Sequence, residues 1–145
     1  MVGLPGAGKS TYARRVYSAH ACVSKDAFPP SARDKPARQD AAVRAALSAG
    51  RSVVVDNTNV TPADRAAIAA VAREFDARVV AVYVEATPRE AIARNERRTG
   101  RAKVPKVAIF TCAKRLVPPA IDEGFDEIVH VRVQPDGSVA NQRRE

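Results

Sequence analysis

Short runs of β-branched apolar residues alternate along the chain with longer segments in which apolar positions recur every three or four residues. The apolar runs are continuous, which is typical of strands that are covered on both faces. They predict strands at Ala21–Ser24, Ser52–Asp56, Arg78–Val84 and Glu127–Val133. Because strands and helical segments alternate, we expect a parallel sheet with helices packed on it.

The helical segments carry clear start and stop signals. Thr61 and Thr87 each precede a proline, a pair that caps a helix and opens its first turn. Gly50 follows the end of another helical pattern. We predict helices from about Ser10 and over Lys35–Ala49, Pro62–Phe75, Pro88–Arg98 and Pro105–Leu116, a basic loop at 99–104, and a turn at Pro135–Ser138. The expected fold class is α/β, a three-layer sandwich around a central parallel sheet of about five strands.

Length and composition narrow the class of protein further. The 145 residues fit one domain, spanning 1–145, and 46% hydrophobic residues are too many for a disordered chain. Aromatic residues make up only 5%, so a surface of stacking aromatics for single-stranded nucleic acid is not expected. The net charge of +8 favours polyanionic partners such as nucleotides, nucleic acid or phosphorylated metabolites, although an Arg-rich solvated surface would give the same charge.

The cysteine pattern and the hydropathy of the chain bear on where the protein is located in the cell. Cys22 and Cys112 lie far apart, without the spacing of metal ligands, so both are expected to be buried or neutral thiols, which fits a reducing cytoplasm. No apolar run reaches the ~18 residues of a membrane helix. We therefore predict a cytoplasmic protein that does not bind a membrane.

The first residues form a phosphate-binding loop. Gly3-Leu4-Pro5-Gly6-Ala7-Gly8-Lys9-Ser10 matches the P-loop (Walker A) pattern in full, and Thr11 follows it. The glycines allow backbone N–H groups to turn towards phosphates, and the following helix directs its positive end at them. Lys9 is expected to reach the β- and γ-phosphates of ATP, and the Ser10 hydroxyl to ligate Mg²⁺. The motif predicts a P-loop NTPase and does not name the reaction.

A loop of this kind normally follows a buried central strand. Only Met1 and Val2 precede Gly3. We expect that the first strand is truncated here and that the native start lies upstream, so that an N-terminal extension raises the melting temperature.

Two aspartates stand where parallel strands end, the edge at which open sheets carry functional groups. Asp26 follows the strand at Ala21–Ser24 and could accept the proton of an attacking hydroxyl, or else serve as a turn or cap residue. Asp56 ends the next strand and could hold Mg²⁺ through water, as a Walker B carboxylate does, or cap the following turn. Asn57-Thr58-Asn59 could line an acceptor pocket at the same edge.

A basic segment runs from Arg89 to Lys106. It suits an Arg-rich helical lid that closes over the phosphates and brings arginines to the developing charge. The alternative is a solvated helix face, the usual role of such runs. The expected helix places four arginines at spacings of three or four, on one face: Arg94, Arg97, Arg98 and Arg101.

Five blocks of sequence, spread over nearly the whole chain, then suggest a family. They are Val2–Thr11, Lys25-Asp26, Val55–Asn59, Arg94–Arg98 with Val104-Pro105, and the weaker Asp122–Phe125. In these blocks the chain resembles the kinase module of 5′-hydroxyl polynucleotide kinases, of both the phage type and the animal DNA-repair type. The Asp-Asn-Thr-Asn block and the Arg-Asn segment are the more specific parts of this resemblance.

The resemblance implies roles for individual residues. Asp26 would be the general base on a 5′-hydroxyl, and Arg98 the lid arginine at the transferring phosphate. Arg94 would lie near the adenine. The acceptor strand's phosphates would contact Lys25, Thr58 and Arg65.

Some features depart from this family. Lys25 replaces an arginine that is frequent there, and residues 28–38 do not match the acceptor-binding stretch. No Asp-x-Asp-x-Thr phosphatase motif occurs in the chain, so a phosphatase or ligase partner would be a separate polypeptide. Three hypotheses stay open at this point. They are a 5′-hydroxyl kinase for DNA or RNA, a kinase for a small acceptor such as a nucleoside, sugar or aminoacyl-tRNA, and an ATP-binding regulatory protein without an acceptor.

Overall fold

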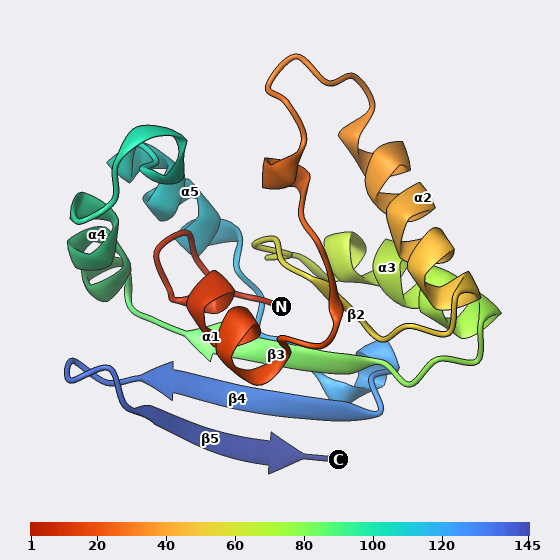
Figure 1. Cartoon of the computed structure of the whole chain (residues 1–145). Helices are drawn as coiled ribbons and strands as arrows, with labels where there is room; N and C mark the ends of the chain where they lie inside the picture. The colour runs from red at the N-terminus through yellow and green to blue at the C-terminus, as the bar shows by residue number, and fades with distance from the viewer.

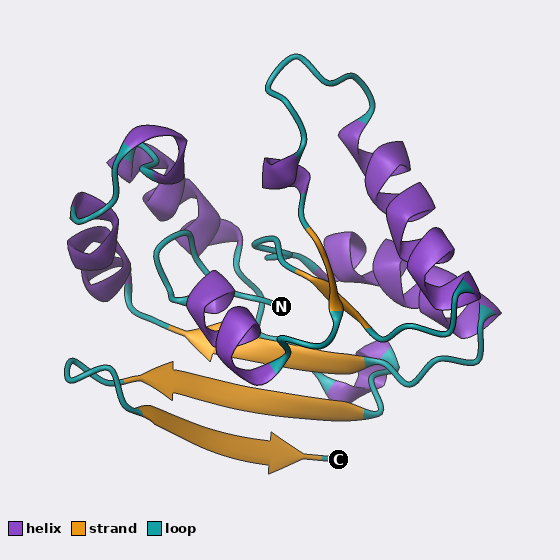
Figure 2. Ribbon diagram, in the orientation of Figure 1, coloured by secondary structure: helices purple, strands orange, loops and turns teal.

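The structure is a computed structural model that describes residues 1–145. Helices alternate with strands through most of the chain, as expected for an α/β protein (Figures 1 and 2). The α-helices are α1 (Lys9–Val16), α2 (Lys35–Ser48), α3 (Pro62–Glu74), α4 (Pro88–Glu96) and α5 (Lys106–Arg115). Short 3₁₀ turns are η1 (Lys25–Ala27), η2 (Gly100–Ala102) and η3 (Ile121–Glu123).

The five strands form two sheets, and this corrects the expectation of one parallel sheet. Strands β1 (Ala21–Val23) and β2 (Val53–Val55) pair in parallel as one sheet. In the second sheet β3 (Val80–Glu85) runs parallel to β4 (Glu127–Val133), which pairs antiparallel with β5 (Val139–Arg144). Only Met1 and Val2 bridge the two sheets: the Met1 amine donates to Val55 O, and Val2 forms an isolated parallel bridge to Tyr83.

The predicted helices are present, with ends shifted by one or two residues. Capping explains the accurate starts of α3 and α4, because Thr61 and Thr87 each form a reciprocal capping box with the acidic residue three positions later. Helix α4 stops at Glu96, so Arg97, Arg98 and Arg101 lie beyond it and the four arginines share no helical face. No helix combines the length and the apolar character needed to cross a bilayer.

The core is divided in the same way as the sheets. One cluster joins β3 and β4 to α4, α5 and the first loop, with Leu4, Val84, Ala91 and Ile109 almost fully buried. A second cluster packs α2 and α3 against β1 and β2. Figure 1 shows α2 and α3 beside β2, and α4 and α5 at the opposite side of the molecule. The first loop and the carboxyl ends of β1 and β2 lie between these two halves.

Candidate nucleotide-binding site

The Gly3–Ser10 loop takes a backbone path that depends on its glycines. Gly6 and Gly8 have φ of 83° and 102°, in the left-handed region that favours glycine. A Cβ on Gly6 would collide with the carbonyl oxygen of Ala91 in α4, so the loop packs directly on that helix. Gly8 is the N-cap of α1, and the first residues of this helix are Lys9 and Ser10. The predicted loop-to-helix geometry of a phosphate site is therefore formed.

Lys9 lies inside this loop. Its Nζ donates a hydrogen bond to Leu4 O at 2.8 Å, and the side chain is only 8% exposed. Burial lowers the pKa of Lys9 to about 8, while the nearby carboxylate of Asp56 opposes that shift. Arg98 and Asp26 also act on the pKa of Lys9, in opposite directions. Asp56, Arg98 and Asp26 therefore lie within electrostatic range of Lys9.

The turn that carries Asp26 is held by the neighbouring strand end. Ser24 caps η1 by accepting from the Asp26 N–H, and the Lys25 N–H donates to Asn57 Oδ1 at 2.9 Å. Asn57 in turn donates to Gln39 Oε1 of α2 at 2.5 Å. Asp26 itself is exposed, so its carboxylate is open to an incoming hydroxyl.

Asp56 is buried at 9% exposure, one residue after β2. Its strand pairs with β1 in the register Val23↔Val55, so Asp56 and Asp26 leave the sheet at the same edge. Ser10 stands in the first turn of α1, next to Lys9. A hydroxyl, a carboxylate and phosphate oxygens are the donor set that Mg²⁺ accepts, because this ion keeps several waters and needs few protein ligands. These residues therefore fit a nucleotide-bound Mg²⁺.

The segment after α4 closes the other side of the loop. Arg94 donates to Ala7 O at 3.4 Å and to Val133 O at 3.0 Å. It borders a cavity of about 140 Å³ that also touches Gly8 and Thr11. Asn95 is fully buried and bonds the backbone of Val104 in both directions, at 2.7 and 3.0 Å.

Arg98 and Arg101 follow the end of α4. Arg98 donates to Ala102 O at 3.2 Å and is only partly exposed. Arg101 reaches across to the base-bearing segment, donating to Phe28 O at 3.3 Å. The segment from Arg94 to Arg101 therefore touches both the phosphate loop and the turn that carries Asp26.

Comparison with known proteins agrees with this geometry. Residues 1–119 match the protein family described as "AAA domain", which is more than half of the chain. The chain belongs to this family. It has the fold of a P-loop kinase. A gluconokinase from Sinorhizobium meliloti 1021 superposes on 92% of this chain and 81% of its own, with a TM-score of 0.65 and 23% sequence identity. A fungal RNA kinase matches 90% of the chain with the same TM-score, 16% identity and 36% of its own length.

A curated relative is the bifunctional polynucleotide phosphatase/kinase of Schizosaccharomyces pombe. It is 29% identical over 138 residues, which cover 90% of this chain. The chain spans about a third (32%) of the length of that protein.

Within this AAA-domain chain, Arg65 does not lie where the sequence predicted. Its side chain is 3% exposed and forms a bidentate ion pair with Glu123, at 2.7 Å from Nε and 2.6 Å from Nη2. Its third nitrogen donates to the carbonyls of Asn59, Val60 and Val117. The guanidinium is fully engaged inside the fold, so an acceptor strand has no access to it.

Asparagines that sequence reasoning placed in an acceptor pocket have internal roles as well. Asn57 fixes the Lys25 turn, and Asn59, at φ 44°, donates from Nδ2 to Met1 O at 2.8 Å. Thr58 stays partly exposed, and its carbonyl accepts from the Gly3 N–H at 3.0 Å. Sequence reasoning missed Gln39, and it placed Glu123 only in a weak block of the family resemblance, without a role. Neither side chain gives a periodic signal, and the role of each is recognisable only from its partner in the fold.

Proposed function

We propose that this chain is an ATP-dependent kinase that transfers the γ-phosphate to the 5′-hydroxyl end of DNA or RNA. The observation that carries the proposal is an exposed Asp26 that follows β1 and lies within electrostatic range of Lys9 in a complete phosphate loop. An ATP-binding switch needs no such base, whereas transfer to a hydroxyl does. The relatives named as a polynucleotide phosphatase/kinase and an RNA kinase favour a nucleic-acid end as the acceptor.

Each residue has one task in the proposed reaction. The backbone of Gly6 and Gly8 and the ammonium of Lys9 bind the phosphates. Ser10 and Asp56 would hold Mg²⁺, which would offset phosphate charge. The acceptor hydroxyl gives its proton to the Asp26 carboxylate, its oxygen bonds to the γ-phosphorus, and ADP leaves.

The lid and the acceptor side complete the site. Arg98 stabilises the charge on the transferring group, and Arg94 borders the adenine. Lys25 and Thr58 flank Asp26 and Asp56 in the chain, which supports a contact with the acceptor's phosphates. Arg65, being internal, is not part of the proposed site.

A small acceptor is the second candidate. The match to gluconokinase covers 81% of that protein, so the same scaffold also serves an enzyme named for a sugar acid. An experiment with γ-labelled ATP, offered a 5′-hydroxyl oligonucleotide, a panel of nucleosides and sugars, or no acceptor, separates the two. Label on the oligonucleotide supports the first proposal, and label only on small molecules overturns it.

Variants connect the activity to the site. Asp26→Asn is expected to reduce transfer by about 10²-fold or more while an ATP analogue still binds. The matched control is Asp122→Asn, an exposed aspartate of η3, which should leave transfer unchanged. Arg98→Ala is compared with Arg89→Ala on the exposed face of α4. A turnover number within twofold of the unmodified chain for Arg98→Ala would remove this arginine from the lid.

A further inference from the structure

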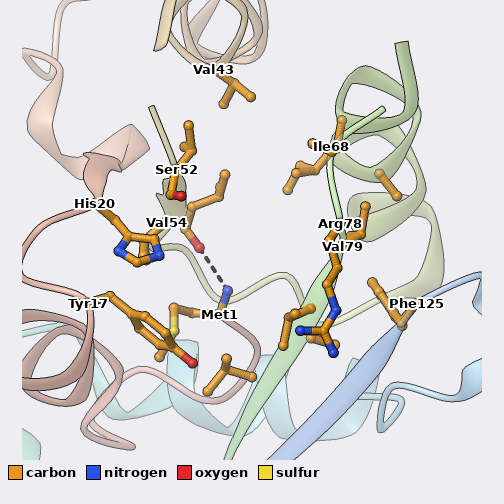
Figure 3. A pocket seen from close by; sticks show the side chains of 18 of the residues that line it. Met1, Tyr17, His20, Val43, Ser52, Val54, Ile68, Arg78, Val79 and Phe125 are labelled. Atoms are coloured by element: carbon orange, nitrogen blue, oxygen red, sulfur yellow. Dashed lines mark hydrogen bonds between the residues drawn. The ribbon is translucent and has the colours of Figure 1, made fainter. Parts of the chain in front are cut away.

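Few contacts hold the two halves of the molecule together. Figure 3 shows a cavity of about 630 Å³ between β2 and β3, with Tyr17 at one side and Ile68 across from it. Asp26 follows β1 in one half, and Arg98 follows α4 in the other. The position of the proposed base relative to the lid arginine therefore depends on the links between the halves.

The turn that carries Asp26 has one side-chain link to the half built on β3 and β4. Within its own half, the Lys25 N–H donates to Asn57 Oδ1. From the other half, Arg101 donates through Nη2 to Phe28 O at 3.3 Å and to Asp26 O at 3.5 Å. No other side chain of that half forms a hydrogen bond with this turn. Arg101 therefore bridges the mouth of the site, from the lid to the base.

The loop that presents Arg101 is closed at its base. Asn95 bonds the backbone of Val104 in both directions, which joins the end of α4 to the start of α5. Within the loop, Arg98 donates to Ala102 O at 3.2 Å, next to Arg101 in the chain. A loop tied in this way moves as one piece, so Arg98 and Arg101 keep their relative position.

The contacts of Arg101 suit alignment better than stability. The residue is exposed, and both of its bonds to the turn are longer than the usual distance of about 2.9 Å. An exposed contact of this strength shifts a conformational population by roughly fivefold at most. The rate of transfer follows the population in which base and hydroxyl are aligned, since a displacement of about 1 Å can cost about 10²-fold.

We propose that Arg101 is a positioning residue, which latches the Asp26 turn to the loop that carries Arg98. The inference rests on the proposed kinase function. In this role Arg101 touches no substrate and acts through the backbone of the turn. Without the latch, the turn keeps its bond to Asn57 but is free on the side of the lid. The aligned population then falls, whereas the phosphate loop and its affinity for nucleotide are unchanged.

A structural measurement tests the latch without any acceptor. Arg101→Met removes every donor at this position, and Arg101→Lys keeps a charged donor. The matched control is Arg89→Met, which removes an exposed arginine of α4. Order parameters from amide NMR relaxation at Ala27 and Phe28 should fall from about 0.85 towards about 0.6 in Arg101→Met alone. Tm should change by about 3 °C or less in all three variants, because the contact is exposed.

Single-turnover transfer tests the consequence, with whichever acceptor the unmodified chain phosphorylates. In Arg101→Met the transfer rate should fall about fivefold, while the KM for ATP and for the acceptor stays within about twofold. Arg101→Lys should restore the rate to within about twofold of the unmodified chain. In an Asp26→Asn background, Arg101→Met should lower the residual rate by less than about twofold, because the base that it positions is gone.

Unchanged order parameters in Arg101→Met overturn the latch, as does an equal loss of rate in Arg89→Met. A raised acceptor KM at an unchanged rate overturns it too, because Arg101 then binds the substrate directly. The same loss of rate with and without Asp26→Asn shows that Arg101 does not act through the base. A chain that phosphorylates no acceptor overturns the proposed function and the catalytic part of this inference, whereas the order parameters still decide whether Arg101 holds the turn.

Discussion

Replacing Arg65 by methionine should destabilise the fold and spare the chemistry. The substitution removes both hydrogen bonds to Glu123 and the donor shared by three backbone carbonyls, all in a region where Arg65 is 3% exposed. Removing one partner of a buried ion pair costs about 3–5 kcal/mol, because the other charge stays buried and unpaired. The carbonyls of Asn59 and Val117 also lose their Arg65 donor, which adds to the cost, whereas Val60 O keeps the Val117 N–H.

The expected change is large for a domain of this size. Total stability is typically about 5–15 kcal/mol, so a loss of about 4 kcal/mol takes away a large fraction of it. At roughly 2–4 °C per kcal/mol, Tm should fall by about 8–16 °C. Scanning calorimetry and guanidinium titration both measure this, with Arg73→Ala as the control, since that exposed arginine contacts only the Glu123 and Gly124 carbonyls.

Activity separates the structural role from a binding role. Well below the variant's Tm, the KM for any acceptor should stay within about twofold of the unmodified chain. A Tm change under about 4 °C, together with a raised acceptor KM, would refute the reasoning, because it would place Arg65 on the substrate. The double variant Arg65→Met with Glu123→Gln should be less destabilised than the sum of the two single changes. Each single change leaves one charge of the pair without its partner, and the double variant leaves neither charge.

The same pair gives a pH signature. Burial acts to raise the pKa of Glu123, but the hydrogen bonds from Arg65 and from the Ala120 N–H outweigh it and lower the pKa below 4.5. The folded carboxyl thus binds its proton less readily than the unfolded one. Its contribution to stability is complete above pH 4.5 and is lost as pH falls through the lowered pKa. In a Glu123→Gln variant, the free energy of unfolding should therefore depend less on pH in this acidic range.

Other predictions concern the loop and the lid. Gly6→Ala should weaken binding of an ATP analogue at least tenfold in calorimetry, whereas Gly137→Ala, with a similar φ and nothing within 4 Å, should cost only about 1–2 kcal/mol of stability. Analogue affinity should fall as pH rises above about 8, where Lys9 loses its charge, and Lys9→Met should abolish that dependence. Asn95→Ala should cost about 2–4 kcal/mol and speed hydrogen exchange at Val104, because a buried amide pair loses both partners.

Local signals explain how much of the fold the sequence revealed. The helices α3 and α4 were predicted to within two residues because each begins with threonine and proline and needs no distant partner. Strand β5 was missed because Val139–Arg144 is mainly polar and exposed, and its strand geometry comes from hairpin pairing with β4. The division into two sheets was also missed, since periodicity reports which segments are strands and is silent on which strands pair.

For the site residues too, the sequence predicted the roles that depend on local features and missed those that depend on distant partners. Asp26 and Asp56 were identifiable because carboxyl ends of parallel strands share an edge, a rule that needs only strand assignments. Arg65 was predicted to contact the acceptor because a basic residue on a helix is usually exposed. Its partner Glu123 lies 58 positions away in sequence, so no local pattern indicated that the side chain is buried.

Lys9 is expected to change its hydrogen-bond partner when a nucleotide binds. In the proposed site, a phosphate oxygen replaces the neutral Leu4 O as the acceptor for Lys9, and the new acceptor is anionic. Neighbouring phosphate charge favours the ammonium form and moves the pKa of Lys9 upward from about 8. Binding therefore takes up a proton above about pH 8, and at lower pH it gains from the attraction between the phosphates and a buried ammonium. A loop with a buried lysine should therefore bind the ligand with the highest negative charge most tightly. This favours ATP over AMP, even without contacts to the adenine base.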